Sequence, residues 1–537
     1  MPQDSARRND FDAVIVGAGF AGICALHRLR ALGLSVQALE AADDIGGTWY
    51  WNRYPGARCD VESMCYSYSF SPELEREWLW TERYATQAEI LRYLEHVVER
   101  FALRPLIRFR TRLTRAILDE SSGCWQLFTD RGEPLTARFI VMATGCLSEP
   151  RLPVIPGLED FQGRTYQTSR WPHESVDFSG QRVGVIGTGS SGIQCIPVIA
   201  AQAAHLTVFQ RTPNFSVPAH NAPLDPVARR ELMNNYPPFR KALREGFTSL
   251  VPETPQPSAL ELTSEEREQR YQAAWKEGGI KLMFCVSDAI VSKPANDTLA
   301  HFVRERIREI VKDPEVAQRL LPKDYPLGTK RLCVDSDYFA TYNRQNVTLV
   351  DLRATPIIGA TRLGLRTQAA EYPLDSLIFA TGFDAMTGAL SAIEIRGREG
   401  RCLVDEWRDG PRTYLGICVA GFPNLFMITG PGSPSVLSNM VISIEQHVEF
   451  IAELIGAMRA QGARTAEAQE AAQQAWVTHV AEVASGTLFP QANSWYMGSN
   501  IPGKPRVFLP YVGGVGPYRK KCEELAAAGY AGFELRA

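Results

Sequence analysis

The chain has 537 residues, 45% of them hydrophobic and 22% charged, which fits several folded domains and excludes a disordered protein. A formal net charge of −3 gives no basis for nucleic-acid binding, and no apolar run approaches the roughly 20 residues that cross a membrane. The 11 cysteines form no C-x-x-C pair and the 8 histidines have no metal-ligand spacing, so we expect reduced thiols and no metal site.

The N-terminal segment, "MPQDSARRND", is polar and leads directly into the first predicted strand. It lacks the apolar centre of a signal peptide, which favours a cytoplasmic protein. Residues 12–16 form a short apolar run that predicts a buried parallel strand, and residues 21–32 have the apolar spacing of a helix.

Between this strand and this helix lies a glycine-rich turn, with Gly17, Gly19 and Gly22 in the order G-x-G-x-x-G. The first glycine permits the tight turn, the second lets the backbone approach a pyrophosphate, and the third lets the helix pack on the strand. The phosphate then rests on the free N–H groups at the start of the helix. We therefore predict a dinucleotide-binding site at this turn.

The next predicted strand, "LSVQALE", identifies which dinucleotide fits this site, because it ends in Glu40. A carboxylate at this place accepts hydrogen bonds from ribose hydroxyls and repels a 2′-phosphate. The first site therefore suits FAD or NAD, and we interpret it as an FAD site.

Residues 51–60 are rich in proline, glycine and aromatic residues and predict a loop. A second apolar strand, "FIVMATG", ends at Gly145. The segment that follows, "SEPRLPVIPG", is interrupted by prolines and is a plausible domain boundary.

A second dinucleotide unit is predicted from about residue 181 to residue 212, with Gly187, Gly189 and Gly192 in "VGVIGTGSSG". Its second strand, "LTVFQRT", places Arg211 where the first unit has Glu40. A guanidinium there can hold a 2′-phosphate with two hydrogen bonds, so this site is predicted to bind NADPH. Two dinucleotides in one chain indicate electron transfer between them.

From residue 223 to residue 323 the pattern becomes charged and helical, as in "HFVRERIREIVKDPEVAQRL", and predicts a helical insertion. Strands are predicted at 346–352 and 376–382, the second ending in "ATG" like the strand before Gly145. A further strand lies within 422–432, and an amphipathic helix is predicted over 442–458. The paired "ATG" strands favour a nested arrangement of the two units.

The predicted fold class is α/β, with two dinucleotide-binding (Rossmann-like) domains, the NADPH domain nested in the FAD domain, and a helical insertion. We expect the FAD-binding domain at residues 1–148 and 383–537, with a C-terminal segment that covers substrate and cofactor. The NADPH-binding domain is expected at residues 149–221 and 324–382, and the helical insertion at residues 222–323.

Two longer motifs resemble those of one enzyme family. "FQGRTYQTSRWP" resembles the F-x-G-x-x-x-H-x-x-x-W-P fingerprint of type I Baeyer–Villiger monooxygenases, with Gln167 at the histidine position. The motif G-x-W-x-x-x-x-Y-P-G-x-x-x-D is complete, and "SWYMGSNIPGKPR" is also similar to the family. The resemblance spans essentially the whole chain and is closest to the phenylacetone and steroid monooxygenase branch. The matching residues are Phe161, Gly163, Trp171 and Pro172, and then Gly47, Trp49, Tyr54, Pro55, Gly56 and Asp60.

The resemblance implies an FAD-dependent monooxygenase that uses NADPH and O2 to convert ketones to esters or lactones. In such enzymes the reduced flavin adds dioxygen at C4a, and the resulting peroxide must stay deprotonated to attack a carbonyl. An anion in an apolar cavity needs a fixed positive partner. Arg331 matches the family arginine that holds this C4a-peroxyflavin, and Asp60 would orient it. Outside these motifs the same two residues would be interpreted as a structural ion pair.

The resemblance also assigns contacts to both cofactors. Lys330 and Arg331 are adjacent on an extended segment and point opposite ways, so one can face the 2′-phosphate and the other the flavin. Trp495 resembles the family tryptophan that closes over the nicotinamide nucleotide, and its alternative role is core packing. The expected FAD contacts are Gly17, Gly19, Phe20, Gly22, Glu40, Thr48, Trp49, Trp51, Asp60, Tyr66, Leu113 and Met440. The expected NADP contacts are Arg58, Gly187, Thr188, Gly189, Ser190, Ser191, Gly192, Arg211, Thr212, Lys330, Arg331 and Trp495.

The segment "GSPSVLSNM" resembles the substrate-lining loop of the family, with Ser435, Val436 and Leu437 as candidates for shaping the pocket. Gln167 can form hydrogen bonds but cannot titrate near neutral pH as histidine does. It is interpreted first as a neutral substitute for the histidine. The alternatives are a slower domain rearrangement that releases hydrogen peroxide, or a drift toward another monooxygenation.

Three other functions share part of the pattern. A flavin-containing monooxygenase that oxygenates nitrogen or sulfur has both glycine motifs, but its chemistry needs no arginine beside the peroxide. A disulfide reductase needs a cysteine pair beside the flavin, and Cys59 and Cys65 lack that spacing. A non-catalytic flavoprotein would turn over no NADPH with any ketone. The expected partners are a small ketone and O2, with no obligate protein partner evident.

Overall fold

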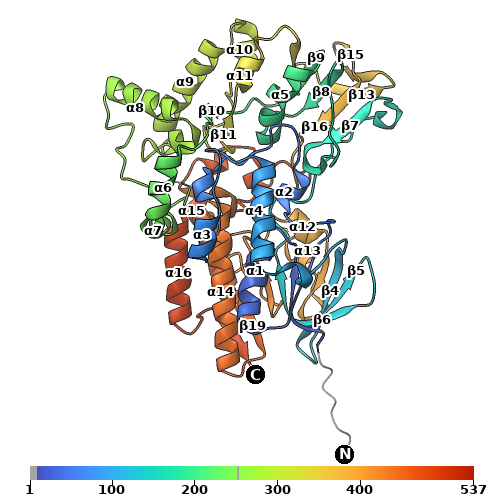
Figure 1. The fold of residues 1–537 in the computed structure, drawn as a ribbon, viewed down its shortest axis with the longest axis vertical. Helices are drawn as coiled ribbons and strands as arrows, with labels where there is room; N and C mark the ends of the chain where they lie inside the picture. Colours follow the sequence, from blue (N-terminus) through green and yellow to red (C-terminus); the bar gives the residue numbers. More distant parts are fainter. Residues whose placement is uncertain (1–8, 251–252) are drawn as a thin grey trace, which may run out of the picture.

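The computed structural model describes residues 9–250 and 253–537, in which two main sheets lie one above the other in Figure 1. The lower sheet has the strand order β17-β4-β5-β6-β1-β2-β3, and β18 pairs with the carboxyl-terminal half of β6. Its pairs are parallel except β4–β5 and β5–β6. The strands are β1 (Phe11–Val16), β2 (Val36–Leu39), β3 (Ile107–Arg108), β4 (Leu113–Asp119), β5 (Cys124–Thr129), β6 (Leu135–Met142), β17 (Glu394–Arg396) and β18 (Leu425–Met427).

The upper sheet is entirely parallel and has the order β12-β9-β8-β16-β7. Because β16 lies in this sheet and β17 and β18 lie in the first, the chain leaves the first unit and returns to it, which confirms the nested α/β arrangement. The residue numbers of the domain boundaries stay a prediction. The strands are β7 (Arg164–Gln167), β8 (Arg182–Ile186), β9 (His205–Gln210), β12 (Val347–Asp351) and β16 (Ser376–Phe379).

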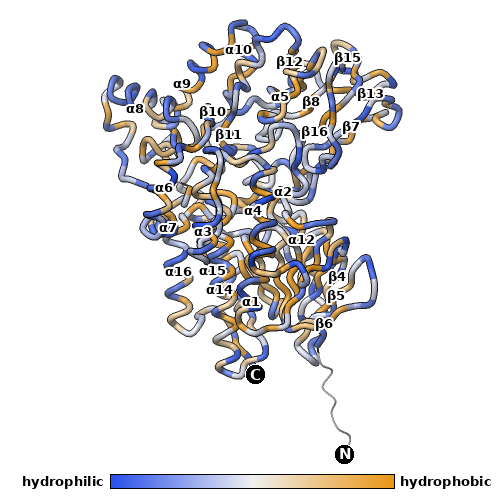
Figure 2. Tube along the Cα trace, in the orientation of Figure 1, coloured by the Kyte–Doolittle hydropathy of each residue, from blue (hydrophilic) through white to orange (hydrophobic). Residues whose placement is uncertain are grey.

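The central strands are apolar on both faces because elements pack against both sides of each sheet. The last four residues of β1 and all four of β16 are buried. Figure 2 shows the same concentration of hydrophobic residues along the strands around β4 to β6. The strands predicted at 12–16 and 376–382 are therefore confirmed, with small differences at their ends.

Small sheets and helices complete the structure. No helix among the described residues is both long enough and apolar enough to cross a membrane. The small sheets are β10 (Ser216–Pro218) with β11 (Cys333–Asp335), β13 (Ile357–Thr361) with β14 (Gly364–Thr367) and β15 (Glu371–Pro373), and β19 (Thr465–Ala468) with β20 (Phe533–Arg536). The α-helices are α1 (Phe20–Ala31), α2 (Thr48–Trp51), α3 (Pro72–Glu77), α4 (Gln87–Arg100), α5 (Ser190–Gln202), α6 (Pro226–Asn234), α7 (Tyr236–Glu245), α8 (Ser264–Glu277), α9 (Lys293–Ile310), α10 (Pro314–Leu320), α11 (Tyr338–Thr341), α12 (Gly388–Ser391), α13 (Leu403–Glu406), α14 (Met440–Ala460), α15 (Glu470–Ser485) and α16 (Val515–Ala527).

Helix α14 differs from its prediction. The sequence predicts an amphipathic helix over 442–458, but nearly every residue up to Ile455 is buried, including the polar Glu445, Gln446 and His447. The helix packs against both α1 and α16, so it has no broad solvent-facing side. The amphipathic prediction is wrong because two helices cover the polar face as well.

The predicted helical insertion is divided between two hydrophobic cores. Tyr236 and Leu243 of α7, together with Leu250, are buried in the core of the first unit. Leu299 and Val303 of α9 are buried in the core of the second unit. The first helices of the segment therefore belong structurally to the lower sheet and the later ones to the upper sheet, as Figure 1 shows for α7 and α9.

A buried ion pair attaches α7 to the first unit. Arg240 donates from Nε to Oε1 of Glu75 at 2.6 Å, and the two side chains are only 7% and 9% exposed. Its Nη2 donates to Oγ of Ser67 at 2.6 Å, and its guanidinium lies over the ring of Tyr236. Through Glu75 and Ser67 this arginine joins α7 to the first unit.

We expect Arg240→Ala to lower the free energy of unfolding by about 3–5 kcal/mol, because it leaves the Glu75 carboxylate buried without its partner. The control is Lys241→Ala, which removes an exposed pair with Glu245 and should cost about 0.5 kcal/mol or less. Urea unfolding followed by circular dichroism measures both. Equal midpoints for the two variants would contradict the role of Arg240.

Candidate active site

One large cavity, of about 1930 Å³, opens between the two sheets. Its lining includes Val16 and Leu39 at the carboxyl ends of β1 and β2, and Ile186 and Phe209 at the carboxyl ends of β8 and β9. The carboxyl ends of parallel strands are where α/β folds bind their ligands. Both glycine turns therefore open into the same space.

The first glycine turn is built for close contact. Gly17 has φ +110°, and a Cβ there would lie 2.5 Å from the carbonyl oxygen of Ala143. A Cβ on Gly22 would lie 1.8 Å from the carbonyl oxygen of Gly17, so this glycine sets the packing of α1 on β1 and does not line the cavity. Gly19 and Phe20 line the cavity. The three glycines thus divide the roles that the sequence predicts for them.

Glu40 lies at the carboxyl end of β2 and lines the cavity. Its Oε2 accepts a hydrogen bond from the backbone N–H of Ala18 at 2.7 Å, and its Oε1 accepts one from Ala42 at 2.8 Å. Burial raises the pKa of this carboxyl group, and the two N–H donors act in the opposite direction. The side chain is held beside the glycine turn, where a ribose would lie.

The second glycine turn repeats the first. Gly187 has φ +109°, and its Cβ would lie 2.4 Å from the carbonyl oxygen of Ala380, the counterpart of Ala143. A Cβ on Gly192 would lie 2.3 Å from the carbonyl oxygen of Gly187, whereas a Cβ on Gly189 would meet no atom within 4 Å. The alanine of each "ATG" triplet therefore touches the first glycine of its unit, and Gly189 leaves space open for a ligand.

A group of cations lies at the far side of the second turn. Arg211 and Lys330 line the cavity, and so do Arg151 and Arg353. Burial, followed by the charges of Arg211 and Arg353, lowers the pKa of Lys330 to about 8. Its Nζ donates to the carbonyl oxygen of Asn493. This concentration of positive charge fits a bound phosphate group.

Sequence reasoning found Arg211 and Lys330 but missed Arg353. Arg353 follows β12, which pairs with β9, and Arg211 follows β9. The two arginines are therefore neighbours because of the strand order, which is not visible in one sequence. The Arg353 guanidinium pairs with Asp324, which also lines the cavity.

Arg331 and Asp60 form a two-point ion pair inside the cavity. Nε of Arg331 donates to Oδ2 of Asp60 at 3.0 Å, and Nη2 donates to Oδ1 at 2.8 Å. Nη1 donates to the carbonyl oxygen of Val436 at 2.9 Å. Burial is the largest single influence on the guanidinium and lowers its pKa, but Asp60, Tyr496 and Cys333 together raise the pKa by more, so the group stays charged at all working pH values. The structure brings the two predicted catalytic residues together.

Most other predicted cofactor residues also line the cavity. Nε1 of Trp49 donates to the hydroxyl of Tyr66 at 3.3 Å, and Oγ1 of Thr188 donates to the carbonyl oxygen of Thr212 at 3.0 Å. Gly22 and Gly192 are the two predicted cofactor residues that do not line the cavity. Each packs against the first glycine of its own turn. The remaining predicted residues that line the cavity are Thr48, Trp51, Leu113, Met440, Ser190, Ser191 and Trp495.

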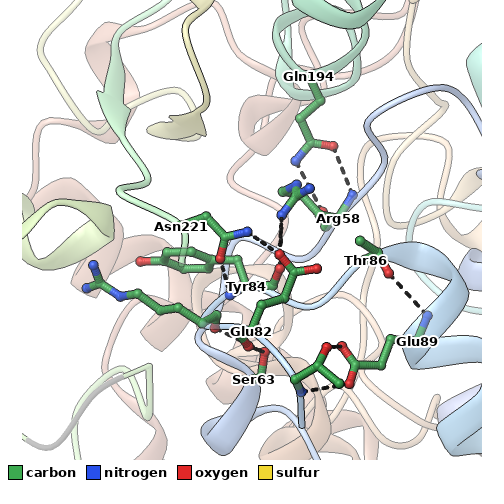
Figure 3. Close-up of polar contacts among 10 residues, drawn as sticks. Arg58, Ser63, Glu82, Tyr84, Thr86, Glu89, Gln194 and Asn221 are labelled. Atoms are coloured by element: carbon green, nitrogen blue, oxygen red, sulfur yellow. Dashed lines mark hydrogen bonds and ion pairs between the residues drawn. The ribbon is translucent and has the colours of Figure 1, made fainter. Parts of the chain in front are cut away.

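Arg58 lines the cavity but uses its guanidinium elsewhere. Its Nη1 contacts Oε2 of Glu82 at 3.2 Å and the carbonyl oxygen of Tyr84 at 3.1 Å (Figure 3). The expected contact of Arg58 with NADP stays a prediction. Its backbone is held by Gln194, a residue that sequence reasoning did not single out.

Two predicted groups lie away from the cavity wall. Of the three candidate residues for shaping the pocket, only Val436 lines the cavity; Leu437 does not, and Ser435 is buried with its Oγ 3.3 Å from Sγ of Cys146. The fingerprint residues form β7 and the turn after it: Gln167 ends β7 and is not among the lining residues. Trp171 is buried, and its backbone N–H donates to the carbonyl oxygen of Trp51 at 3.3 Å. The other fingerprint residues that do not line the cavity are Phe161, Gly163 and Pro172.

Cys59, which lines the cavity, and Cys65, which does not, are buried free thiols. Burial raises the pKa of Cys59, and it raises the pKa of Cys65 to about 12. A disulfide reductase needs a reactive thiolate, which these surroundings disfavour. Among the described residues no group of three or more His, Cys, Asp or Glu side chains could hold a metal ion.

Comparisons with known proteins agree with this geometry. The family model described as pyridine nucleotide-disulphide oxidoreductase matches residues 14–256. A Baeyer–Villiger monooxygenase of Pseudooceanicola batsensis is 44% identical over 97% of this chain and 95% of its own length. Phenazine N-monooxygenase PhzNO1 of Lysobacter antibioticus is 44% identical over 98% of this chain and 97% of its own.

Among solved structures, an oxidized steroid monooxygenase bound to NADP is 53% identical, with a TM-score of 0.94 over 98% of this chain and 99% of its own. This agrees with the predicted steroid monooxygenase branch. Similar solved structures include complexes with FAD and NADP.

The cation group generates a prediction for Lys330. We expect its amine to react with an acylating reagent with a half-maximal rate near pH 8, because burial and two arginines favour the neutral form above that pH. Inorganic phosphate should move this midpoint to higher pH, since an anion stabilises the ammonium form. Mass spectrometry of labelled peptides measures the profile, with the exposed Lys323 as the internal comparison. Identical profiles for the two lysines would contradict the predicted shift.

Proposed function

The chain belongs to the Baeyer–Villiger monooxygenase family, and on that premise we propose that it converts a ketone to an ester or lactone with FAD, NADPH and O2. The observation that carries the proposal is the Arg331–Asp60 pair, which fixes a positive charge inside the cavity onto which both glycine turns open. The two glycine turns, each a predicted dinucleotide site, account for the electron transfer in the reaction. The arginine accounts for its selectivity for a carbonyl carbon.

FAD fits the first turn. Its pyrophosphate would rest against Gly19 and the start of α1, where a side chain other than hydrogen would fill the space, and its ribose would meet Glu40. Trp49, Tyr66 and other lining residues supply an apolar and aromatic surface for the ring. FAD, when bound, supplies two-electron chemistry that activates dioxygen.

NADPH fits the second turn. Gly189 leaves the phosphate approach open, and Arg211, Lys330 and Arg353 present charge to a 2′-phosphate. Arg353 forms an ion pair with Asp324. A bound 2′-phosphate would take the place of Asp324 as the partner of this guanidinium. Trp495 lines the same cavity and is positioned to cover a nicotinamide nucleotide.

Arg331 acts on negative charge that develops on oxygen. Asp60 and the carbonyl oxygen of Val436 hold its guanidinium from two sides, so it needs no rearrangement when charge appears. Because the pKa of the guanidinium is raised, it cannot give up its proton to that oxygen. A fixed cation that cannot act as an acid stabilises an oxyanion and leaves a nucleophilic oxygen unprotonated.

The substrate class follows from the surface beside this charge. Val436, whose carbonyl oxygen accepts a hydrogen bond from Arg331, lines the cavity, as do Met440 and Ile444, and all three are apolar. We propose a small apolar ketone whose carbonyl oxygen faces Arg331. One relative is named a phenazine N-monooxygenase, so oxygenation of nitrogen is the alternative that the product assay must separate from the ketone reaction. That chemistry transfers oxygen to a soft atom and gains nothing from the arginine.

Gly189→Ala tests the coenzyme site. The alanine fits the protein, since φ at this position is −82° and no atom lies within 4 Å of the new Cβ, but the methyl group enters the phosphate approach. Loss of one hydrogen bond to a charged phosphate costs about 1.5–3 kcal/mol, so the Kd for NADP+ should rise on the order of tenfold or more. Titration measures the Kd, and FAD content should stay unchanged. Gly456→Ala, also in open space, is the control.

Arg331→Ala tests the reaction. Loss of one preformed oxyanion donor typically costs on the order of 100- to 1000-fold, so ester formation should fall by about that factor while NADPH oxidation continues. The assay supplies NADPH, isotopically labelled O2 and a panel of ketones, amines and sulfides, with mass analysis of products. Arg408→Ala removes an exposed arginine and is the control. Undiminished ester formation in Arg331→Ala, or labelled oxygen found only on nitrogen or sulfur, would reject the ketone proposal.

A further inference from the structure

Gln194 connects the two dinucleotide-binding units through its side-chain amide. It lies on α5, one turn after the serines of the second glycine turn. Its Oε1 accepts a hydrogen bond from the hydroxyl of Tyr54 at 2.8 Å and one from the backbone N–H of Arg58 at 3.4 Å. Its Nε2 donates to the carbonyl oxygen of Arg58 at 3.1 Å. The amide thus pairs with one backbone residue of the first unit on both its N–H and its C=O (Figure 3).

Gly56 explains why the amide can reach this backbone. It has φ +83°, and a Cβ there would lie 2.6 Å from the carbonyl oxygen of Gln194 and 3.1 Å from a methyl group of Val198. The loop from Tyr54 to Arg58 therefore packs directly on one turn of α5. No side chain separates the loop from the helix at this point.

The other side of Arg58 is fixed as well. Its guanidinium contacts Glu82 and the carbonyl oxygen of Tyr84, and Asn221 contacts the same Glu82 carboxylate and the N–H of Tyr84 (Figure 3). Arg58 also forms a backbone bridge with Thr86. The backbone at Arg58 is held between α5 on one side and residues 82–86 on the other.

Asp60 lies two residues beyond this fixed point, and it holds Arg331. We propose that Gln194 is a positioning residue that ties the place of the Asp60–Arg331 pair to α5, the helix that presents the coenzyme phosphate turn. Gln194 contacts neither Asp60 nor Arg331 in its hydrogen bonds and acts through the backbone of Arg58. The proposal rests on the proposed function for its catalytic consequence, although its structural part needs only bound FAD and NADP+.

The consequence concerns how oxygen is used. With Gln194 in place, the backbone that leads to Asp60 keeps a fixed position relative to α5, and so does the charge that acts on the oxygen atom. Without Gln194, the segment at Arg58 can shift relative to α5. Asp60 and the Arg331 guanidinium would shift with it, away from the position of the reacting oxygen. Small misplacements of reacting groups cost large factors in rate, whereas release of hydrogen peroxide needs no such alignment. That side reaction consumes NADPH, a proton and O2 and yields NADP+ and H2O2.

The test uses Gln194→Met, which keeps length and volume but removes all three hydrogen bonds. Gln194→Glu keeps the two accepted bonds and loses only the donated one. Gln202→Met makes the same change at an exposed position on the same helix and is the control. Each holoenzyme is measured for FAD content, for the change in flavin absorption on adding NADP+, and for the ratio of H2O2 to ester per NADPH oxidised.

We expect Gln194→Met to retain FAD, to show a reduced flavin difference spectrum with NADP+, and to raise the H2O2-to-ester ratio on the order of tenfold. Gln194→Glu should lie between this variant and the parent, and Gln202→Met should match the parent. If Gln194→Met loses FAD, Gln194→Glu carries the same comparison. A parental difference spectrum and parental peroxide ratio in a flavin-loaded Gln194 variant would overturn the inference. If the parent itself makes no ester, the proposed function fails, and the difference spectra still decide the inference.

Discussion

The ion pair between Arg331 and Asp60 depends on the relative placement of two separate cores. The neighbours of Asp60 in sequence, Cys59 and Val61, are buried in the first core, and Leu332 and Cys333, which follow Arg331, are buried in the second. A guanidinium removed from water is costly unless its donors are satisfied, and here the first unit supplies the carboxylate that satisfies two of them. The same contact that keeps the cation charged therefore also defines how the two units meet.

Much of the fold was predictable because its signals are local. Each glycine turn, the strand before it and the helix after it occupy about one short stretch of chain, and the steric reasons for Gly17 and Gly187 are found within their own units. Glu40 and Arg211 were predictable for the same reason, since each follows the next strand at a regular spacing. Arg331 and Asp60 were predictable only through the motif resemblance, because nothing in their spacing places them together.

What the sequence did not reveal depends on neighbours distant in the chain. Arg353 joins the cation group through the pairing of β12 with β9, and Gln194 contacts Arg58, which lies 136 residues earlier in the chain. The burial of α14 on nearly all sides follows from helices that come from both ends of the chain. Ser435 contacts Cys146 and does not line the cavity, because its side chain is placed by packing that one sequence does not show. These are tertiary contacts between residues distant in the chain, and local sequence patterns do not predict them.

The division of the helical segment between the two cores has a mechanical consequence. Because α7 is anchored in one core and both β9 and α9 belong to the other unit, the chain crosses between the units once before α7 and once after it, in addition to the crossings from β6 to β7 and from β16 to β17. Relative motions of packed domains are limited by the segments that join them. The crossings beside α7 therefore restrict how far the two units can separate around the cavity that they share.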